Sequence, residues 1–185
     1  MKRYGGVVVA LQLIVEFLNT VDERTFSRHG QSHVGGEELS SPRALAGWLA
    51  ARGLVADGAA IEPEDLTATT ALRTTLRTTL RESLTGGPDA AAALAGYPLR
   101  LALDHSGGLR VTARTGRPWL DAIVETVAVS AARGDWKRVK LCAAPDCRWA
   151  FHDTSRNGRG RWCEMEVCGN RHKTRTYRER HPRTT

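Results

Sequence analysis

Residues 142–168 read CAAPDCRWAFHDTSRNGRGRWCEMEVC and contain all four cysteines of the 185-residue chain. The cysteines form two equally spaced C-x4-C pairs, Cys142 with Cys147 and Cys163 with Cys168, and 15 residues separate the pairs. Zinc prefers four soft ligands at the corners of a tetrahedron, and two short chelating loops can supply two thiolates each. We therefore expect these cysteines to bind one structural Zn²⁺ ion, with no open coordination position for catalysis.

Two other readings of the cysteines remain open, namely a pair of disulfides and redox or catalytic thiols. The first 141 residues contain no cysteine, whereas a secreted, disulfide-stapled fold would spread its bridges more widely. The four-residue gap is wider than the two-residue gap of the common zinc knuckle, which makes the pattern less specific. Zinc is nevertheless the reading that the clustering favours.

The residues around the cysteine pairs predict a hairpin and a helix. Residues 148–152 (RWAFH) have the composition of a strand, Asn157-Gly158 is a strong hairpin-turn signal, and residues 161–163 would begin the return strand. Residues 169–180 lack proline and read as a helix that ends before Pro182. A knuckle, a hairpin and a helix in that order are typical of a treble-clef zinc finger.

Charge is segregated along the chain, whose formal net charge is +7. Residues 137–185 hold 13 Lys and Arg against 5 Asp and Glu, a net charge of +8, whereas residues 1–136 carry a net charge of −1. This segregation indicates a polyanionic partner for the C-terminal part and a different role for the rest. A solvated basic tail is the alternative.

The basic residues of the predicted finger are candidates for DNA contacts. Arg171, Arg175 and Arg178 have i, i+4, i+7 spacing and share one helix face. Asn170 and Arg171 could read base edges, although Asn170 could equally bond the finger's own loops. Non-specific phosphate or RNA binding is the alternative for the arginines. The expected DNA-binding residues are Arg156, Arg159, Arg161, Asn170, Arg171, Lys173, Arg175 and Arg178.

The first part of the chain predicts a mainly helical domain with a small β-hairpin. Apolar spacing predicts helices over residues 10–20, 41–52, 64–84 and 118–132, with a short strand at 7–9 and a loop at 21–40. Alternation predicts the hairpin 99–103 with 109–113. The Thr and Arg residues at 67–81 read as a solvated helix face. The predicted class is α+β, with a helical domain at 1–135 and a treble-clef-like zinc finger at 136–185.

The N-terminal run MKRYGGVVVALQLIVEFLNT resembles a signal peptide, but no small-residue cleavage pattern follows it. The run is also shorter than the ~20 apolar residues that a transmembrane helix needs. We expect a cytoplasmic protein without membrane association. Glu16, Asn19 and Thr20 follow the apolar run, and they predict a helix cap or hydrogen-bond network, with a ligand pocket as the alternative.

The segment from Leu141 to Arg180, above all Cys168-Gly169-Asn170-Arg171, resembles the CGNR zinc finger. The stretch 13–20 (LIVEFLNT) and the helix ending in Trp48-Leu49 are similar to the N-terminal ABATE domain that accompanies this finger. The resemblance implies a stress-induced bacterial transcription regulator, with zinc on the four cysteines and DNA contact by the finger. Glu16 and His152 depart from the family pattern, where Asp and Tyr are expected.

We therefore expect a DNA-binding regulator rather than an enzyme, with double-stranded DNA as its partner. One small finger buries only about 600–1,000 Å² on DNA, so we expect the N-terminal domain to dimerise or to sense a small-molecule effector. A metal-dependent treble-clef nuclease is the enzymatic alternative, with His152, Asn157 and His172 on roughly the required elements. A zinc module for RNA or protein interaction is the third reading.

Overall fold

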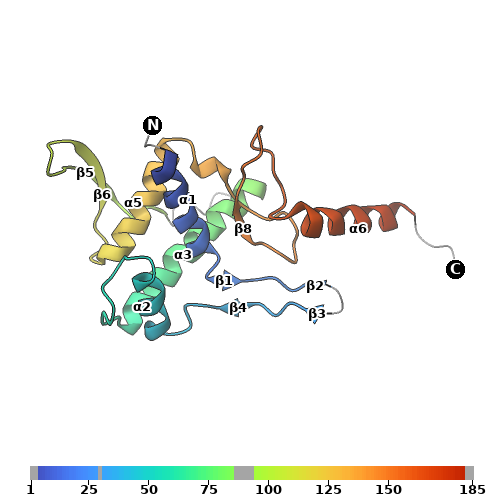
Figure 1. Ribbon diagram of the computed structural model, residues 1–185, viewed down its shortest axis with the longest axis horizontal. Coiled ribbons are helices and arrows are strands. Elements are labelled where there is room, and N and C mark those ends of the chain that lie inside the picture. Colours follow the sequence, from blue (N-terminus) through green and yellow to red (C-terminus); the bar gives the residue numbers. More distant parts are fainter. Residues whose placement is uncertain (1–3, 29–30, 86–93, 182–185) are drawn as a thin grey trace.

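The computed structural model describes residues 4–28, 31–85 and 94–181, and a helical body precedes the four-cysteine module and the last helix (Figure 1). The predicted α+β class, mainly helical with small antiparallel sheets, is confirmed. In chain order the elements are α1 (Tyr4–Leu18), β1 (Val21–Asp22), β2 (Ser27–Arg28), β3 (Gln31–Ser32), β4 (Gly36–Glu37), α2 (Pro42–Ala50), α3 (Pro63–Thr85), β5 (Leu99–Leu103), β6 (Leu109–Ala113), α5 (Pro118–Ala132), η1 (Trp136–Arg138), β7 (Val139–Leu141), β8 (Ala150–His152), η2 (Met165–Gly169) and α6 (Asn170–Arg180).

The hydrophobic core lies between α1, α2, α3 and α5, and the apolar faces predicted for these helices are buried in it. Burying such side chains supplies most of the driving force for folding, at about 1.5–3 kcal/mol for each large one. Among the described residues, no helix is long and apolar enough to cross a membrane. The core side chains of the four helices include Leu11, Ile14, Phe17, Leu18, Leu45, Trp48, Leu49, Leu72, Leu76, Leu80, Leu120, Ile123 and Val124.

The helix limits follow local signals except at the start of α1. The side chain of Ser41 accepts a hydrogen bond from the backbone N–H of Ala44 at 3.1 Å, which caps α2. Gly53 has a φ of +66°, which suits the turn that follows this helix. α1 begins at Tyr4, so the strand expected at 7–9 is wrong. The valines there favour a strand locally, but they are continuous with a helix whose apolar face packs into the core.

The other predicted elements of the helical body are present. α3 spans Pro63–Thr85, close to the predicted 64–84. β5 and β6 form the predicted antiparallel hairpin, and α5 spans Pro118–Ala132 as predicted. The left-handed φ of +79° at Gly134 ends the turn after α5.

Residues 21–28 and 31–37, expected to be part of a loop, instead form an extended antiparallel arm (Figure 1). β1 pairs with β4 at the base of the arm, and β2 pairs with β3 farther out. The loop prediction is therefore wrong. Each ladder is only two residues long and shows no apolar alternation, so the sequence carries no strand signal there.

Two arginines of α3 fix the base of the arm. Both are buried, so the prediction that the Thr and Arg residues at 67–81 form a solvated helix face is wrong for these two. The side chains of Arg73 and Arg77 are only 6% and 4% exposed. Arg73 donates to Thr20 Oγ1 at 2.8 Å and to Glu37 Oε1 at 2.7 Å. Arg77 donates to the carbonyl of Leu18 at 2.7 Å. The arginines are buried because their acceptors come from distant parts of the chain, which spacing within α3 does not reveal.

The strands β7 and β8 connect the helical core to the cysteine module. They pair antiparallel, and Val139, Leu141 and Ala150 are buried in the same core as the helices. The side chain of Asn19, at the end of α1, exchanges two hydrogen bonds with the backbone of Ala150, at 2.9 and 2.8 Å. The side chain of Asn19 therefore bonds β8 as a neighbouring strand would, and it joins α1 to β8.

The polar residues at the end of α1 form the predicted hydrogen-bond network rather than a ligand pocket. Thr20 donates to the carbonyl of Phe17 at 2.8 Å, which caps the end of the helix. Glu16 pairs with Arg52 at 2.9 Å, and this guanidinium also lies over the ring of Trp48. The Glu16–Arg52 pair joins α1 to the end of α2.

Candidate metal centre and nucleic-acid interface

The fold brings the four cysteines together. Cys142 follows β7, Cys147 precedes β8, Cys163 precedes η2, and Cys168 lies within η2. Their four Sγ atoms lie within 4.8 Å of one another, with 3.7 Å between Cys147 and Cys163 and 3.8 Å between Cys163 and Cys168. Four sulfurs at about 2.3 Å from a tetrahedral zinc ion would be about 3.8 Å apart. The cluster therefore fits one structural zinc ion.

The disulfide reading does not fit this geometry. All four cysteines are free, and a separation of 3.7 Å is far longer than the ~2.05 Å of an S–S bond. Backbone N–H groups of Cys163 and Ala144 donate to the sulfur of Cys142, and that of Trp149 donates to Cys147. Such donors are typical partners of metal-bound thiolates.

The electrostatics of the cluster also favour a cation. Burial, together with the nearby thiols of Cys142 and Cys147, raises the pKa of Cys168 to about 12. Hydrogen bonds from the neighbouring thiols lower the pKa of Cys142, so one thiolate is stabilised at the expense of the others. A divalent ion would let all four sulfurs ionise together, and the energy of binding it would stabilise the fold of the module.

The loop between the two cysteine pairs differs from the predicted hairpin. β8 pairs with β7, which precedes the first cysteine, and residues 161–163 form no strand. The return strand expected there is therefore wrong. The turn itself does occur, with Gly158 at a φ of +61° and Asn157 Oδ1 accepting from the backbone N–H of Arg159 at 3.2 Å.

Asp153, which was not among the predicted site residues, holds this loop together. Its buried carboxylate accepts from Lys140 Nζ at 2.6 Å and from the backbone N–H groups of Gly160 and Ser155 at 2.7 and 3.0 Å. Burial alone would raise the pKa of Asp153, but these hydrogen bonds hold it well below its ordinary value. The loop is thus closed by one ionised carboxylate instead of a strand ladder.

The predicted DNA-binding residues occupy two places in the structure. Arg156, Arg159 and Arg161 are exposed on the loop between the cysteine pairs. The other five lie on α6, whose N-terminal end follows η2 directly. Asn170, Lys173, Arg175 and Arg178 are exposed, whereas Arg171 is half-buried. The exposed members are therefore available to a large ligand.

Arg171 makes contacts within the chain that the sequence did not predict. Its guanidinium lies 3.8 Å from the ring centroid of Phe26 in the arm, and it forms an ion pair with Asp146 of the first knuckle. The backbone carbonyl of Asp146 accepts from Thr25 of the arm at 3.0 Å. Arg171 thus joins the arm, the knuckle and α6, and its base-reading role stays a prediction.

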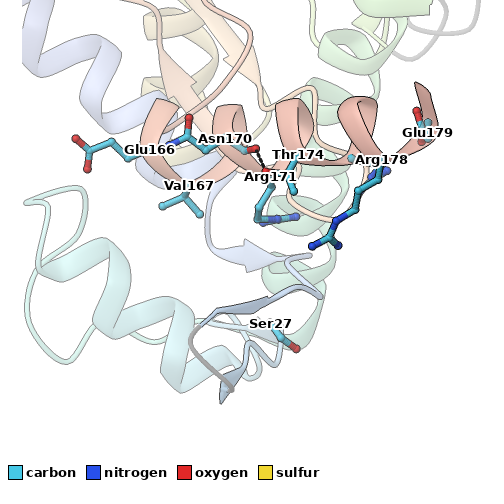
Figure 2. Close-up of a pocket in the computed structure, with 9 residues that line it drawn as sticks. Ser27, Glu166, Val167, Asn170, Arg171, Thr174, Arg178 and Glu179 are labelled. Carbon is cyan, nitrogen blue, oxygen red and sulfur yellow. Dashed lines mark hydrogen bonds between the residues drawn. The ribbon is translucent and has the colours of Figure 1, made fainter. Parts of the chain in front are cut away.

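A groove of about 1130 Å³ separates α6 from the arm (Figure 2). We call it the basic groove, because three arginines and two neutral polar residues of α6 line it. Ser27 lies across from them on the arm, and Glu166 and Glu179 lie toward its two ends (Figure 2). The residues of α6 in its lining are Asn170, Arg171, Thr174, Arg175, Arg178 and Glu179.

The residues of the nuclease alternative form no cluster with the metal ligands. Within the described part of the chain, the four cysteines are the group of Cys, His, Asp and Glu residues that could hold a metal ion. The ring of His172 packs against that of Trp162 with the centroids 4.8 Å apart and the planes tilted by 36°, and Asn157 takes part in the turn described above. His152 lies in β8, within the pair of strands.

The fold and the site define a helical domain joined to a C-terminal zinc-finger module. Comparison with family models agrees, since residues 138–181 match the CGNR zinc finger. Residues 11–134 match the ABATE family, described as "Putative stress-induced transcription regulator", and the chain belongs to this family. The comparison with curated proteins gives no match.

Proposed function

We propose that the zinc-bound protein is a cytoplasmic transcription regulator that binds double-stranded DNA through α6 and the basic groove. The observation that carries the proposal is the row of arginines that α6 presents to an open groove. α6 carries five Lys and Arg residues and one acidic residue, Glu179. The match to a regulator family supports the same reading.

The dimensions of α6 suit the major groove of DNA. An 11-residue helix is about 16 Å long, and the major groove of B-DNA is about 12 Å wide and admits one helix. In this arrangement one sugar-phosphate strand would lie in the basic groove, between α6 and the arm. Arg175 and Arg178 would neutralise phosphates, and Thr174 could donate to one.

The first turn of α6 is the part best placed to read bases. Asn170 is exposed there, and an asparagine carboxamide can bond the N6 and N7 positions of adenine. Arg171 would then act mainly by positioning α6, because Phe26 and Asp146 hold its guanidinium. We retain it as a second base-reading candidate, since it also lines the basic groove.

The zinc ion would be held by Cys142, Cys147, Cys163 and Cys168 and would be structural. It would fix the two knuckles against each other, and the second knuckle leads directly into α6. The loop residues Arg156, Arg159 and Arg161 and the helix residue Lys173 would add phosphate contacts outside the groove. Because one finger offers a small interface, we also expect two copies of the chain to bind together.

The test is retention of a randomised duplex DNA pool on the zinc-loaded protein, followed by sequencing, with Mg²⁺ or Mn²⁺ added to a parallel sample. An enriched motif in uncut DNA supports the proposal. Salt-sensitive retention without a motif would indicate that the finger binds DNA phosphates without reading the base sequence. Metal-dependent cutting would support the nuclease reading, and preference for an RNA pool would replace DNA as the partner.

A further inference from the structure

A second cavity, of about 800 Å³, lies where α3, η1, β7 and the loop before Cys163 meet. It shares no lining residue with the basic groove. Its inner wall is apolar, with Leu80 from α3, Trp136 from η1, and Val139 and Leu141 from β7. Its volume is within the range of about 300–1,000 Å³ that is usual for small-molecule sites.

Cationic side chains surround this apolar wall, and we call the cavity the cationic pocket. Lys137, Arg148, Arg159 and Arg161 line it, and none of the residues that line it is acidic. Lys140 also lines it, but its amino group is bound to Asp153. The other four have no carboxylate within ion-pair distance among the described residues. Their charge is therefore uncompensated within the described structure.

The backbone of Arg148 gives an independent reason to regard this pocket as a binding site. Arg148 has a φ of +53°, and it is the one described residue other than glycine with a positive φ. The first knuckle imposes this conformation, since the N–H of Arg148 donates to Ala144 at 3.3 Å and its carbonyl accepts from Arg77 at 3.0 Å. Glycine would adopt it without strain, so an arginine here costs stability and places a cation at the pocket.

We propose that the cationic pocket binds a small amphipathic anion, with a carboxylate or phosphate group and an apolar, ring-sized body. The anionic group would lie among Arg148, Arg159 and Arg161, and the apolar body would contact Trp136 and Leu80. The charge complementarity identifies the ligand class, and the apolar wall distinguishes it from an inorganic ion. The inference does not depend on DNA binding, because Arg148 and the apolar wall have no part in the proposed DNA contacts. Arg159 and Arg161 belong to both sets.

The test uses the zinc-loaded full-length protein and two fluorescent probes. One is 1-anilinonaphthalene-8-sulfonate, an aromatic monoanion, and the other is N-phenyl-1-naphthylamine, the same ring system without the charge. The proposal expects saturable binding of the anion, much weaker binding of the neutral probe, and a shift of the Trp136 indole NMR signal. Equal affinity for both probes would overturn it, because the cations would then contribute nothing.

The variant Arg148→Gly separates binding from folding, because it removes the cation and relieves the positive φ. We expect it to bind the anion about tenfold more weakly, as expected for loss of one ionic hydrogen bond, with an unchanged or higher melting temperature. The matched control is Arg156→Gly, on an exposed loop residue outside the pocket, which should bind as the unmodified chain does.

Three further results would overturn the proposal. The first is normal anion binding by folded Arg148→Gly protein. The second is equal weakening in Arg156→Gly, which would indicate a general charge effect. The third is a short DNA duplex that, without any probe present, shifts the Trp136 signal as the anionic probe does, because the pocket itself would then hold the DNA backbone.

Discussion

Replacing Arg73 by methionine should destabilise the protein and free the arm. The side chain of Arg73 is 6% exposed, and it donates to Thr20 Oγ1 at 2.8 Å and to Glu37 Oε1 at 2.7 Å. Methionine has a similar length and is tolerated in apolar surroundings, so it preserves packing while removing these hydrogen bonds. The variant therefore tests the ionic contact at the base of the arm.

The expected change in the free energy of unfolding combines opposing contributions. Breaking a buried ion pair by removing one partner costs about 3–5 kcal/mol when the other charge stays buried. Glu37 is 38% exposed and can recover hydration. Nε of Arg73 is buried and has no hydrogen-bond partner among the described residues, so methionine relieves one penalty. We expect the free energy of unfolding to fall by about 2–4 kcal/mol, below the full value for a buried pair.

Urea unfolding of the zinc-loaded protein, followed by circular dichroism, measures this change, and hydrogen exchange locates it. Amides of β1 and β4 should lose protection before those of α1 and α3. The control is Arg43→Met, an exposed arginine of α2, which should change stability by no more than about 0.5 kcal/mol. Unchanged or increased stability of Arg73→Met would refute the reasoning, because the desolvation cost of Arg73 would then exceed the value of its contacts.

Three other perturbations test the remaining parts of the structure. A zinc chelator should remove hydrogen-exchange protection from residues 142–181 and from the backbone around Phe26, but leave α1 and α3 protected. Loss of the circular-dichroism signal of all helices would contradict this. Arg178→Ala should weaken binding to every duplex and reduce the slope of log affinity against log salt concentration by about 0.9. Asn170→Ala should instead relax the sequence preference at one base pair. Identical effects of the two variants would contradict the separate roles proposed for phosphate contact and base reading. Burial alone would raise the pKa of Glu37, but hydrogen bonding from Arg73 lowers it below its ordinary value. The stability that the ionised Glu37 contributes is therefore complete above the ordinary glutamate pKa of about 4.3. It is lost as pH falls through the lower pKa that Glu37 has in the folded protein. Glu37→Gln should therefore flatten the loss of stability below about pH 4.3, and an unchanged acid slope would count against this ion pair.

Features that depend on short-range pattern were predicted well from the sequence. The faces of α2 and α3 were predicted because Leu45, Trp48 and Leu49, and likewise Leu72 and Leu76, recur at helical spacing. The proximity of the four cysteines followed from two short chelating loops of equal length. In each case the signal lies within a few neighbouring residues or in one repeated residue type.

Features that depend on contacts between distant residues were predicted poorly. The arm was read as a loop, because Arg73, which fixes its base, lies 36 and 53 residues along the chain from its partners Glu37 and Thr20. The return strand was wrongly predicted after Asn157-Gly158, because Asp153 closes that loop instead. No spacing rule links such residues, and their pairing becomes evident only once the helices have packed.

These long-range contacts give α3 two connections to the finger. Through Arg77, α3 donates to the carbonyl of Arg148 in the first knuckle, and through Arg73 it holds the base of the arm. The arm in turn packs Phe26 against Arg171 on α6. α6 is therefore oriented by the helical domain as well as by zinc. A displacement of α3 would act on the knuckle and on the arm together. In the proposed complex with DNA, a ligand bound beside Leu80 would therefore be placed to change the orientation of α6.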